Sequence, residues 1–475
     1  AMIKVFAECT VTALLKDGAG SDSGAGRISG AVGYLRENGT FVVFEAPAII
    51  LATGGIGKSY KVTSNSWEYT GDGHALALRA GASLINMEFL QFHPTGMVWP
   101  PSVKGILVTE SVRGDGGVLT NSEGKRFMFD YIPDVFKPHY ATTEEEGDRW
   151  YTDADNNRRP PELLPRDEVA RAINSEVKAG RGSPHGGVFL DVSSRLKPEV
   201  IIKKLPSMHH QFKELADVDI TKEPMEVGPT CHYVMGGVEV DPDTAAASVP
   251  GLFAAGECSG GMHGSNRLGG NSLSDLLVFG RRAGAGAAAY LDSLGGDRPK
   301  ISEDDVQIAA RRSVAAFGDG GQDGAENPYT LHQELQQTMN DLVGIIRRED
   351  EIEQALEKLE GLKARGESVI VEGHRQFNPG WHLALDLRNM LLVSECVAKA
   401  AILRTESRGG HTRDDFPAMD AEWRHVLLVC TLAADGTIDI NRKQQIPVRG
   451  DLLELFEGDE LEKYFTPEEL SGGTR

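Results

Sequence analysis

Cysteine is scarce in this sequence, and its spacing excludes one class of site. The 475 residues contain five cysteines, and no two of them form a CxxC pair: Cys9, Cys231, Cys258, Cys396 and Cys430. Structural zinc sites and iron–sulfur clusters draw on closely spaced cysteines or histidines. This chain alone lacks such ligands, so we expect no metal site in it. Widely spaced cysteines, odd in number, are typical of a reducing compartment.

An excess of basic charge is absent as well. The chain has 49 lysines and arginines against 70 aspartates and glutamates, which gives a formal net charge of -21. Nucleic acids and anionic lipids attract basic surfaces, so neither is expected as the main partner. A small anionic substrate would need its own local cluster of arginines and histidines.

Long apolar runs are missing too. The sequence has no stretch of about 18 uninterrupted apolar residues, so it predicts no membrane-spanning helix. Residues 1–10 do not combine a basic region with an apolar one, which argues against a signal peptide. We expect the chain to begin inside a folded domain.

The stretch around which the rest is organised is residues 251–280, GLFAAGECSGGMHGSNRLGGNSLSDLLVFG. The apolar run Leu252–Ala255 predicts a strand that leads to Glu257. A glycine-rich loop with Arg267 then precedes a helix that begins near Ser272. Glycines allow a backbone to approach a planar or phosphorylated ligand, and a helix start offers free N–H groups to an anion. The combination predicts the floor of a cofactor site. A helix cap is the lesser alternative for Glu257, and simple capping is equally available to Asn271.

The first 82 residues predict strands followed by a helix. Alternating segments at 2–16 and 28–52 surround an Asn38-Gly39 turn and predict a hairpin or meander that leads into a buried strand. That strand ends in ATGG, residues 52–55, and helical periodicity follows at 71–82. This order suits a doubly wound nucleotide-binding layer. An ordinary strand-to-loop turn explains ATGG equally well.

The middle of the chain has a different predicted secondary structure. Between residues 88 and 236, loops and short strands prevail, with one clear helix at 167–179. The segment 142–165 is very polar, and we expect it to be a surface insertion. Strand and helix patterns return after residue 238, so the first domain is expected to be discontinuous.

The last third of the chain is mostly helical. Residues 301–409 show helical periodicity with breaks at Gly366 and at Asn378-Pro379-Gly380, which predicts a three-helix bundle. Two apolar runs, 426–432 and 436–440, predict an antiparallel strand pair before an acidic tail.

Six polar side chains stand out, because their neighbours are apolar or because acid and base share one loop: His93 in EFLQFHPTG, Thr109, Glu110 and Arg113 in LVTESVRGDGG, His232 in GPTCHYVMGG, and Arg267 in HGSNRLGG. Each has an ordinary explanation too. A lone histidine is commonly a structural residue, and an acid beside a base is commonly a surface salt bridge. These residues indicate a site only if the fold brings them together.

Six motifs, taken in order, resemble those of one family: QFHPTG, TESVRGDGG, GPTCHYVMGG, GLFAAGE, SNRLGGNSL and RTESRGGH. The sequence is similar to the flavoprotein subunit of succinate dehydrogenase and fumarate reductase, the complex II family. The resemblance covers nearly the whole chain. Family members begin with a GxGxxG segment for the FAD pyrophosphate and then a histidine that binds FAD covalently. Neither lies within this sequence, which resembles the family's C-terminal portion.

The resemblance implies site residues, position by position. Substrate, succinate or fumarate, would be bound by His93, Thr109, Glu110, His232 and Arg267. Arg113 matches the family's proton-transfer arginine, and Glu110 offers a relay because an arginine alone is very basic. The implied cofactor is FAD, at Thr53, Gly54, Gly55, Asp72, Glu257, Asn271, Ser272 and Leu273. The histidine for covalent attachment is expected outside this sequence.

The resemblance also implies the fold class and the domains. The fold class is α/β, with a partial, doubly wound FAD-binding domain, an inserted α+β capping domain, a helical bundle domain and a small C-terminal domain that contains β-strands. The expected bounds are 1–90 with 236–298 for the FAD-binding domain, whose N-terminal βαβ unit is absent, 91–235 for the capping domain that binds substrate, 299–418 for the helical domain and 419–475 for the C-terminal domain.

The implied activity is that of a FAD-dependent succinate:quinone oxidoreductase, which oxidises succinate to fumarate with transfer of hydride to FAD. The implied partners are an iron–sulfur subunit, which receives the electrons, and through it a quinone-binding membrane anchor. The implied location is peripheral, on the cytoplasmic face of a bacterial inner membrane or on the matrix side in a mitochondrion.

Three alternatives stay open at this point. The enzyme could work in the fumarate reductase direction. L-aspartate oxidase, a soluble relative with the same motifs, would oxidise an amino dicarboxylate, although the C-terminal strand pair and the long late helix disfavour it. A chain without the first nucleotide-binding unit could also bind no FAD and act only as a non-catalytic docking fragment.

Overall fold

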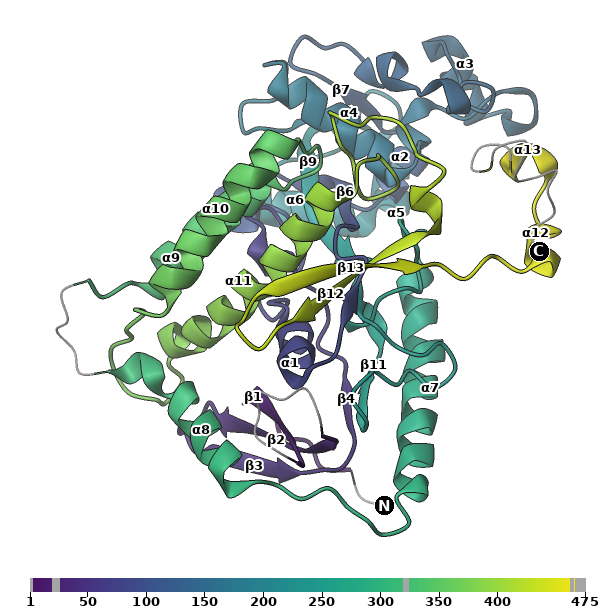
Figure 1. The fold of residues 1–475 in the computed structure, drawn as a ribbon. Coiled ribbons are helices and arrows are strands. Elements are labelled where there is room, and N and C mark those ends of the chain that lie inside the picture. Colours follow the sequence, from purple (N-terminus) through teal and green to yellow (C-terminus); the bar gives the residue numbers. More distant parts are fainter. Residues whose placement is uncertain (1–2, 19–25, 319–323, 462–464, 466–475) are drawn as a thin grey trace. The chain divides into compact units, whose positions relative to one another are not determined.

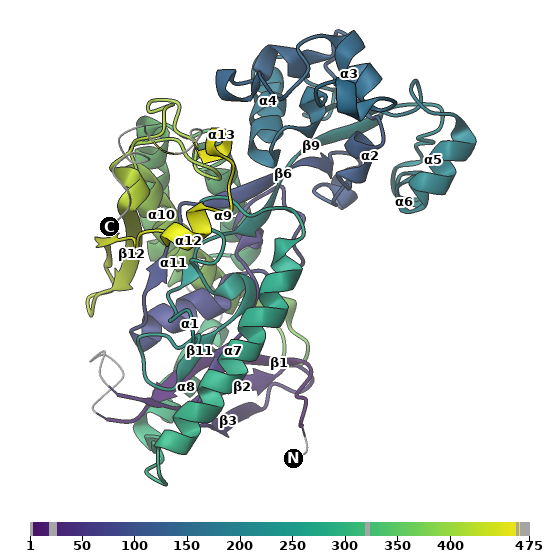
Figure 2. The ribbon, with the colours of Figure 1, turned by 90° about the vertical axis from the view of Figure 1, so that its right-hand side faces the viewer.

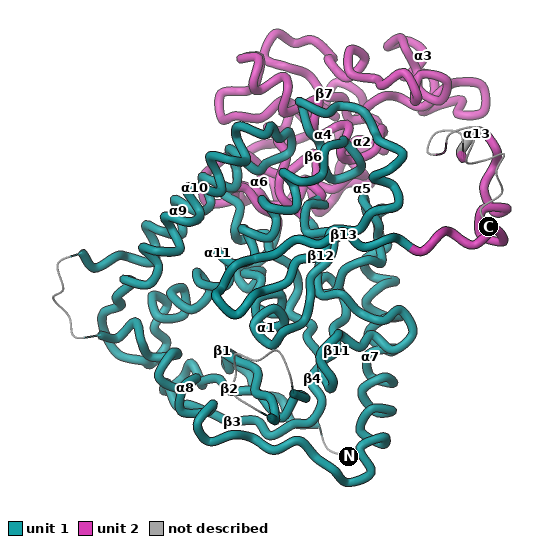
Figure 3. Tube along the Cα trace, in the orientation of Figure 1, with its two compact units in different colours: residues 1–61, 65–90, 233–445 teal, residues 62–64, 91–232, 446–475 magenta. Residues whose placement is uncertain are grey.

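The computed structural model describes residues 3–18, 26–318, 324–461 and 465. The chain forms two compact units (Figure 3). Unit 1 comprises residues 1–61, 65–90 and 233–445, and unit 2 comprises residues 62–64, 91–232 and 446–475. The four-domain division expected from the sequence is finer than these two units and stays a prediction.

Unit 1 begins with an antiparallel three-stranded sheet (Figure 1), formed by β1 (Cys9–Lys16), β2 (Ile28–Leu35) and β3 (Phe41–Glu45). The central strand, β2, is buried over most of its length. The chain turns from β2 to β3 at Gly39, whose φ of 69° favours glycine, and the Thr40 N–H donates to the Asn38 side chain. The predicted Asn38-Gly39 hairpin is therefore confirmed.

The nucleotide-binding layer of unit 1 contains a parallel strand pair, β4 (Ile49–Leu51) and β11 (Leu252–Ala254), and the helices α1 (Asp72–Ala80) and α7 (Asn271–Ser293). α1 is bounded by two glycines in the left-handed region, Gly71 and Gly81. α7 runs along the surface of unit 1 in both views (Figure 1 and Figure 2). These elements confirm the predicted strand, loop and helix of residues 251–280.

The prediction of a buried strand before ATGG is wrong in part. β4 has three residues, and its central residue, Ile50, is 41% exposed. β4 pairs with β11 alone in the described part of the chain, so no strand lies along the other edge of β4 there.

Helices α9 (Pro328–Leu342), α10 (Glu349–Gly366) and α11 (Pro379–Leu403) pack pairwise and form the predicted three-helix bundle. α9 and α11 begin in the same way, with an asparagine whose side chain accepts from a backbone N–H of the first turn and a proline whose φ already suits a helix. α8 (Glu303–Ser313), which Ser302 caps, packs against β1 and β2.

The predicted C-terminal strand pair is present as β12 (Val426–Leu432) and β13 (Ile438–Gln444), although β13 starts and ends later than expected. This pair belongs to a larger sheet. β12 also pairs with β5 (Leu84–Ile85), which pairs with β10 (Gly237–Val238). Sequence patterns miss β5 and β10, because two residues are too few to show alternation.

Unit 2 holds a four-stranded sheet with the strand order β6 (Leu90–Met97), β9 (Met225–Val234), β8 (Val188–Asp191) and β7 (Val118–Thr120). Its apolar core includes Phe127, Ile173 and Phe212. Five helices follow in the same segment: α2 (Ser111–Gly114), α3 (Glu144–Trp150), α4 (Arg166–Lys178), α5 (Pro198–Lys204) and α6 (Pro206–Ala216). The short helices α12 (Gly450–Leu453) and α13 (Gly458–Leu461) come after β13. α4 confirms the predicted helix at 167–179.

The long segment of unit 2 starts and ends at one place in the chain's fold. Phe89 lies just before residues 91–232, and Met235 lies just after them. The Phe89 carbonyl oxygen accepts a hydrogen bond of 3.0 Å from the Met235 N–H. The two ends of residues 91–232 therefore leave unit 1 from adjacent backbone positions.

Two expectations for unit 2 are wrong. The sequence indicates one clear helix here, whereas α5 and α6 are also present and each begins with a proline in its first turn. The polar segment 142–165 is more than a surface insertion. It contains α3, and its Glu162 is fully buried and paired with Arg126, which explains how so polar a stretch has a fixed place in the fold.

The architecture agrees with the expected fold class, α/β with a nucleotide-binding layer, a helical bundle and late strands. Among the helices of the described ranges, none combines the length and the apolar composition that crossing a bilayer requires.

Candidate active site

Two predicted histidines lie side by side in unit 2. His93 is on β6 and His232 is on the neighbouring strand β9, and their ring centroids are 5.5 Å apart in an edge-to-face arrangement. His93 is buried, with Nδ1 at 3.0 Å from the Thr95 carbonyl oxygen and 3.3 Å from the Thr95 amide nitrogen. His232 is half-buried, and its Nδ1 lies 2.8 Å from Ser64 Oγ. Strand pairing thus joins two motifs that are far apart in the sequence.

His93 is neutral at neutral pH. Burial lowers its pKa well below the usual range, and the positive charges of Arg113, Arg166 and His232 lower it further. A neutral imidazole has one donor nitrogen and one acceptor nitrogen. His93 is therefore suited to hydrogen-bond a substrate, and it adds no charge of its own.

The predicted acid and base also meet in unit 2, at the short helix α2. Glu110 Oε2 lies 4.0 Å from Arg113 Nη2, and it accepts a hydrogen bond of 3.0 Å from Arg166 Nε on α4. One carboxylate therefore contacts two guanidinium groups. Thr109, directly before Glu110, is half-buried, and its hydroxyl lies 3.4 Å from Ser111 Oγ.

Arg113 and Arg166 differ in burial, and this difference decides which of them a ligand can contact. Arg113 is fully buried, and its Nη1 donates to the Glu162 carbonyl oxygen. Burial lowers the pKa of Arg113 to about 10, against the opposing effect of the Glu110 charge. The side chains of Arg166 and Glu110 are 18% and 45% exposed. A ligand at the surface of unit 2 can touch Arg166 and Glu110, whereas Arg113 lies in the interior.

Sequence reasoning missed Arg166. It is 56 positions away from Glu110, so no local motif joins the two. One signal was present: Arg166 is the first residue of α4, where the helix dipole places partial positive charge and an arginine is unfavourable. A cation kept at such a position suggests a partner from elsewhere in the fold.

Several residues predicted to hold the cofactor gather in unit 1 where β4 and β11 end. Gly55 passes Glu257 so closely that a Cβ on Gly55 would lie 2.2 Å from Glu257 Oε1. Thr53 is exposed and donates to Cys258 Sγ at 3.4 Å, and Gly54 is in the left-handed region with φ of 73°. Because parallel strands end at the same edge, the ATGG and GLFAAGE motifs come together.

Glu257 is short of hydrogen-bond donors. Among the described residues, its carboxylate accepts one hydrogen bond, from the Val234 N–H at 3.0 Å. Burial raises the pKa of Glu257 to about 7, although the Val234 N–H and the Arg267 charge act in the opposite direction. A ligand that brings hydroxyl donors would stabilise the charged carboxylate.

The predicted substrate arginine, Arg267, lies beside the start of α7. Its guanidinium carbon is 4.3 Å from the ring centre of Tyr233, and its Nη1 donates to Ser272 Oγ at 3.3 Å. Arg267 is buried, while Asn271 and Leu273 on either side of Ser272 are exposed. The loop and the helix start therefore form one group. Tyr233, which sequence reasoning also missed, fixes the arginine within it.

Asp72 is placed differently from the other predicted cofactor residues. It is the first residue of α1, and its Oδ1 accepts a hydrogen bond of 2.6 Å from Asn389 on α11. It lines a large cavity of unit 1 whose described lining includes none of the other predicted cofactor positions. The described contacts do not join its carboxylate to the group around Glu257.

Comparisons with known proteins identify the family. A model of the FAD binding domain matches residues 1–273, and a model of the fumarate reductase flavoprotein C-terminus matches residues 332–452. One subunit of the fumarate reductase (CoM/CoB) of Methanothermobacter marburgensis is 42% identical over 429 residues, covering 90% of this chain and 70% of that protein. The succinate dehydrogenase flavoprotein subunit of Coxiella burnetii is 38% identical, covering 84% of this chain and 64% of that protein.

A solved structure agrees with these relatives. The structure of Mycobacterium smegmatis Sdh1 in complex with UQ1 contains a chain that is 66% identical, with a TM-score of 0.82, covering 98% of this chain and 72% of that one. This chain belongs to the family of succinate dehydrogenase and fumarate reductase flavoprotein subunits. It spans roughly two thirds of the length of these relatives, whose names include both directions of the reaction.

The cofactor of this flavoprotein is FAD, and the residues of unit 1 fit it. Among the described residues, Glu257 has one hydrogen-bond donor, the Val234 N–H, and the hydroxyl groups of a ribose or ribityl chain would supply more. Gly55 leaves the space beside that carboxylate free of a side chain. Thr53 and the first turn of α7 are accessible. The Asn271 and Leu273 N–H groups donate to the Leu268 and Gly270 carbonyl oxygens, so the positive end of the helix dipole and the Ser272 N–H are what suit negative charge on a ring carbonyl.

Proposed function

We propose that this flavoprotein is the catalytic subunit of a succinate dehydrogenase, which oxidises succinate to fumarate. One observation carries the proposal: unit 2 groups two adjacent histidines with a carboxylate that contacts two arginines. A dicarboxylate needs hydrogen-bond donors at its carboxylates, and its oxidation needs a group that takes a proton from carbon.

We assign substrate binding to His93, Thr109, Glu110, His232 and Arg267. His93 donates from Nε2 when its Nδ1 accepts the Thr95 N–H, which lies 3.3 Å away. His232 is oriented by Ser64. Arg267 supplies positive charge for a carboxylate, and Tyr233 and Ser272 hold its guanidinium in place. A cation that is held before substrate arrives loses little freedom on binding.

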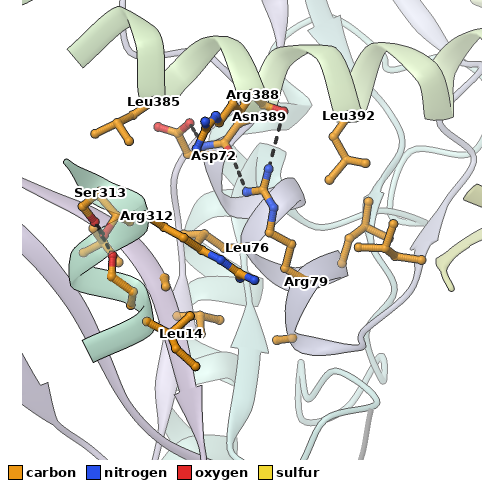
Figure 4. Close-up of a pocket in the computed structure, with 18 of the residues that line it drawn as sticks. Leu14, Asp72, Leu76, Arg79, Arg312, Ser313, Leu385, Arg388, Asn389 and Leu392 are labelled. Atoms are coloured by element: carbon orange, nitrogen blue, oxygen red, sulfur yellow. Dashed lines mark hydrogen bonds between the residues drawn. The ribbon is translucent and has the colours of Figure 1, made fainter. Parts of the chain in front are cut away.

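FAD, when bound, would supply the hydride-accepting chemistry for the oxidation of succinate. The residues of this chain orient the substrate and take the proton that leaves the neighbouring carbon. Glu257 and the start of α7 at Asn271, Ser272 and Leu273 would hold the cofactor, with Thr53, Gly54 and Gly55 beside it. We assign Asp72, whose carboxylate accepts a hydrogen bond from Asn389 (Figure 4), to the cofactor as well.

The proton passes along Arg166, Glu110 and Arg113 in this proposal. Arg113 keeps the catalytic role that the family resemblance implies, and Glu110 is the relay that both arginines contact. Because Arg166 is partly exposed and Arg113 is not, Arg166 is the member that touches substrate. An arginine must lose its proton to act as a base, and burial favours this by lowering the pKa of Arg113.

We further propose that electrons leave first for an iron–sulfur subunit, then for a quinone-binding membrane anchor, so that the protein is peripheral on the cytoplasmic or matrix side of a membrane. The 66% identity to the chain in the Mycobacterium smegmatis Sdh1 structure, which was solved with UQ1, supports the succinate-oxidising direction and a quinone acceptor.

The test is succinate-dependent dye reduction by the purified native complex. Arg113→Ala and Arg267→Ala should each lower kcat/KM by a factor of about 100 or more, as removal of a charged group from a transition state does. Arg298→Ala, at an exposed position outside the proposed site, should keep wild-type turnover.

Two measurements sharpen the result. The flavin absorbance of each variant shows whether FAD is still bound, and L-aspartate offered in place of succinate tests the amino-dicarboxylate alternative. Wild-type turnover in both Arg113→Ala and Arg267→Ala would contradict the proposed site. Faster turnover with L-aspartate than with succinate would overturn the proposed substrate.

A further inference from the structure

Three side chains of unit 1 lie together beside the proposed substrate arginine, Arg267: Tyr233, His263 and Asp275. Tyr233 is near the end of β9, His263 is in the loop that also carries Arg267, and Asp275 is on the second turn of α7. The side chains of His263 and Asp275 are 9% and 3% exposed. The proposed reaction assigns no role to either of them.

One carboxylate oxygen, Asp275 Oδ2, contacts both of the other side chains. It lies 3.3 Å from His263 Nε2, and it accepts a hydrogen bond of 3.5 Å from the Tyr233 hydroxyl. The Tyr233 hydroxyl and His263 Nε2 are 3.3 Å apart, so the three atoms form a triangle. A carboxylate oxygen only accepts hydrogen bonds, and both neighbours can donate. Asp275 is therefore the acceptor that fixes His263 and Tyr233 relative to each other.

The other oxygen of Asp275, Oδ1, is buried and accepts no hydrogen bond from the described residues. A buried carboxylate with one unpaired oxygen costs free energy, so its presence needs an explanation. Holding the loop as a whole does not supply one. The loop is also fixed at Ser265, whose carbonyl oxygen accepts a hydrogen bond of 2.8 Å from the Gly410 N–H.

Tyr233 connects Asp275 to the substrate arginine. The Arg267 guanidinium carbon lies 4.3 Å from the centre of the Tyr233 ring, and the His263 ring lies edge-on to the same ring with the centroids 5.4 Å apart. A phenol that donates to a carboxylate is polarised, so that its ring becomes richer in electrons and attracts a cation above its face more strongly. The contact between Asp275 and Tyr233 thus acts on Arg267.

We propose that Asp275 is a positioning residue for substrate binding, which acts through Tyr233 and His263 to hold the Arg267 guanidinium in the orientation that a substrate carboxylate requires. This inference rests on the proposed function, in which Arg267 binds one carboxylate of succinate. A guanidinium that is already fixed loses little freedom when the carboxylate binds. Without the anchor, binding should weaken while the chemical step stays the same.

The direction of the effect separates positioning from simple electrostatics. Asp275→Asn keeps the shape of the side chain and removes its negative charge. If charge alone mattered, a dianionic ligand would bind this variant more tightly, because a nearby negative charge has been removed. Weaker binding therefore reports the loss of positioning.

The probe is radiolabelled malonate, measured by equilibrium dialysis with the FAD-loaded native complex. Malonate is a dicarboxylate in which a single carbon carries hydrogen, so no double bond can form and the probe does not react. Asp275→Asn should bind malonate about 10-fold more weakly, and the KM for succinate should rise by a similar factor while kcat stays within about twofold. A variant that is merely misfolded would lower kcat and leave KM unchanged.

Two further variants complete the design. Asp292→Asn, at an exposed position on the same helix α7, is the matched control and should bind malonate as the wild type does. Tyr233→Phe keeps the ring and removes the hydroxyl, so it should weaken malonate binding as well. Combined with Asp275→Asn, it should weaken binding by less than the product of the two single effects, because both substitutions break the same hydrogen bond.

Unchanged or tighter malonate binding by Asp275→Asn would overturn the inference. So would a fall in kcat without a change in KM, or effects of Asp275→Asn and Tyr233→Phe that multiply in full. Failure of the proposed function would look different, because the wild-type complex would then not oxidise succinate, or Arg267→Ala would bind malonate as tightly as the wild type. The flavin absorbance of each variant gives the amount of FAD-loaded protein to which the binding is referred.

Discussion

Glu257 is a carboxylate whose charge depends on how many donors surround it. Burial penalises its charged form, and the Val234 N–H and Arg267 compensate in part, so that its pKa rises to about 7. His93 responds to burial in the opposite direction and is neutral. At the scale of residues, the site therefore contains groups whose protonation states the fold has set before any ligand binds.

The pKa of Glu257 leads to a prediction about stability. Because the pKa is about 7 in the folded chain, above the usual 4.5, the folded chain binds this proton more tightly than the unfolded chain. The free energy of unfolding should therefore fall as pH rises from about 4.5 to 7, and it should stay lower above that. Glutamine does not titrate, so Glu257→Gln should remove this fall in the free energy of unfolding.

In the FAD-free protein, Glu257→Gln should raise the free energy of unfolding by about 3 kcal/mol at pH 8, and by nearly nothing at pH 4. The same substitution should weaken FAD binding, since an amide accepts hydroxyl groups less well than a carboxylate does. Urea denaturation at both pH values measures the first effect, and flavin release measures the second. A gain that does not change with pH would contradict the assignment.

Among the elements, the turn of residues 161–163 links the polar segment to the proposed relay. The Glu162 carboxylate pairs with Arg126 at 2.6 Å, and both side chains are buried. The backbone oxygen of the same residue accepts from Arg113. One turn thus neutralises a buried cation and positions the inner arginine.

Glu162→Ala should lower the free energy of unfolding by about 3 kcal/mol or more, because it leaves Arg126 buried with only Asp148 as a carboxylate partner. The control is Asp134→Ala, which breaks an exposed pair with Lys137 and should cost less than about 1 kcal/mol. Urea denaturation compares the two variants. An equal loss of unfolding free energy in both variants would show that the buried ion pair stabilises the fold no more than the exposed pair does.

Sequence patterns predict elements well when the cause of the element is local. The Asn38-Gly39 turn, the Asn378-Pro379 break before α11 and the strand, loop and helix of residues 251–280 are confirmed, because turn, cap and periodicity all lie within a few residues. The two-residue strands β5 and β10 and the burial of Glu162 depend on partners far away in the chain.

The same distinction applies to the candidate site. His93, His232 and Arg267 stand out from apolar or glycine-rich neighbours, so the sequence indicates each of them. Arg166 has its partner 56 residues away, and no local pattern shows it. The family resemblance supplied the roles, and these roles stay proposals for the experiments above.

At the scale of the whole molecule, the chain passes repeatedly between two compact units. Each unit has its own sheets, and the apolar core of unit 2 is formed by residues of its own long segment. Closing a loop of this length costs little more entropy than closing one of half the length, because the cost grows only with the logarithm of length. A large insertion is therefore compatible with a stable unit 1.

The hydrogen bond between Phe89 and Met235 makes residues 91–232 an exchangeable cassette. Since both ends leave from adjacent backbone positions, a linker of about four Gly and Ser residues can replace the cassette without moving its anchors. We expect the shortened chain to unfold cooperatively in urea, as monitored by circular dichroism. A loss of cooperative unfolding would show that unit 1 needs the cassette for its own stability. In evolutionary terms, such an attachment would let residues 91–232 diverge while the rest of the chain keeps its sequence.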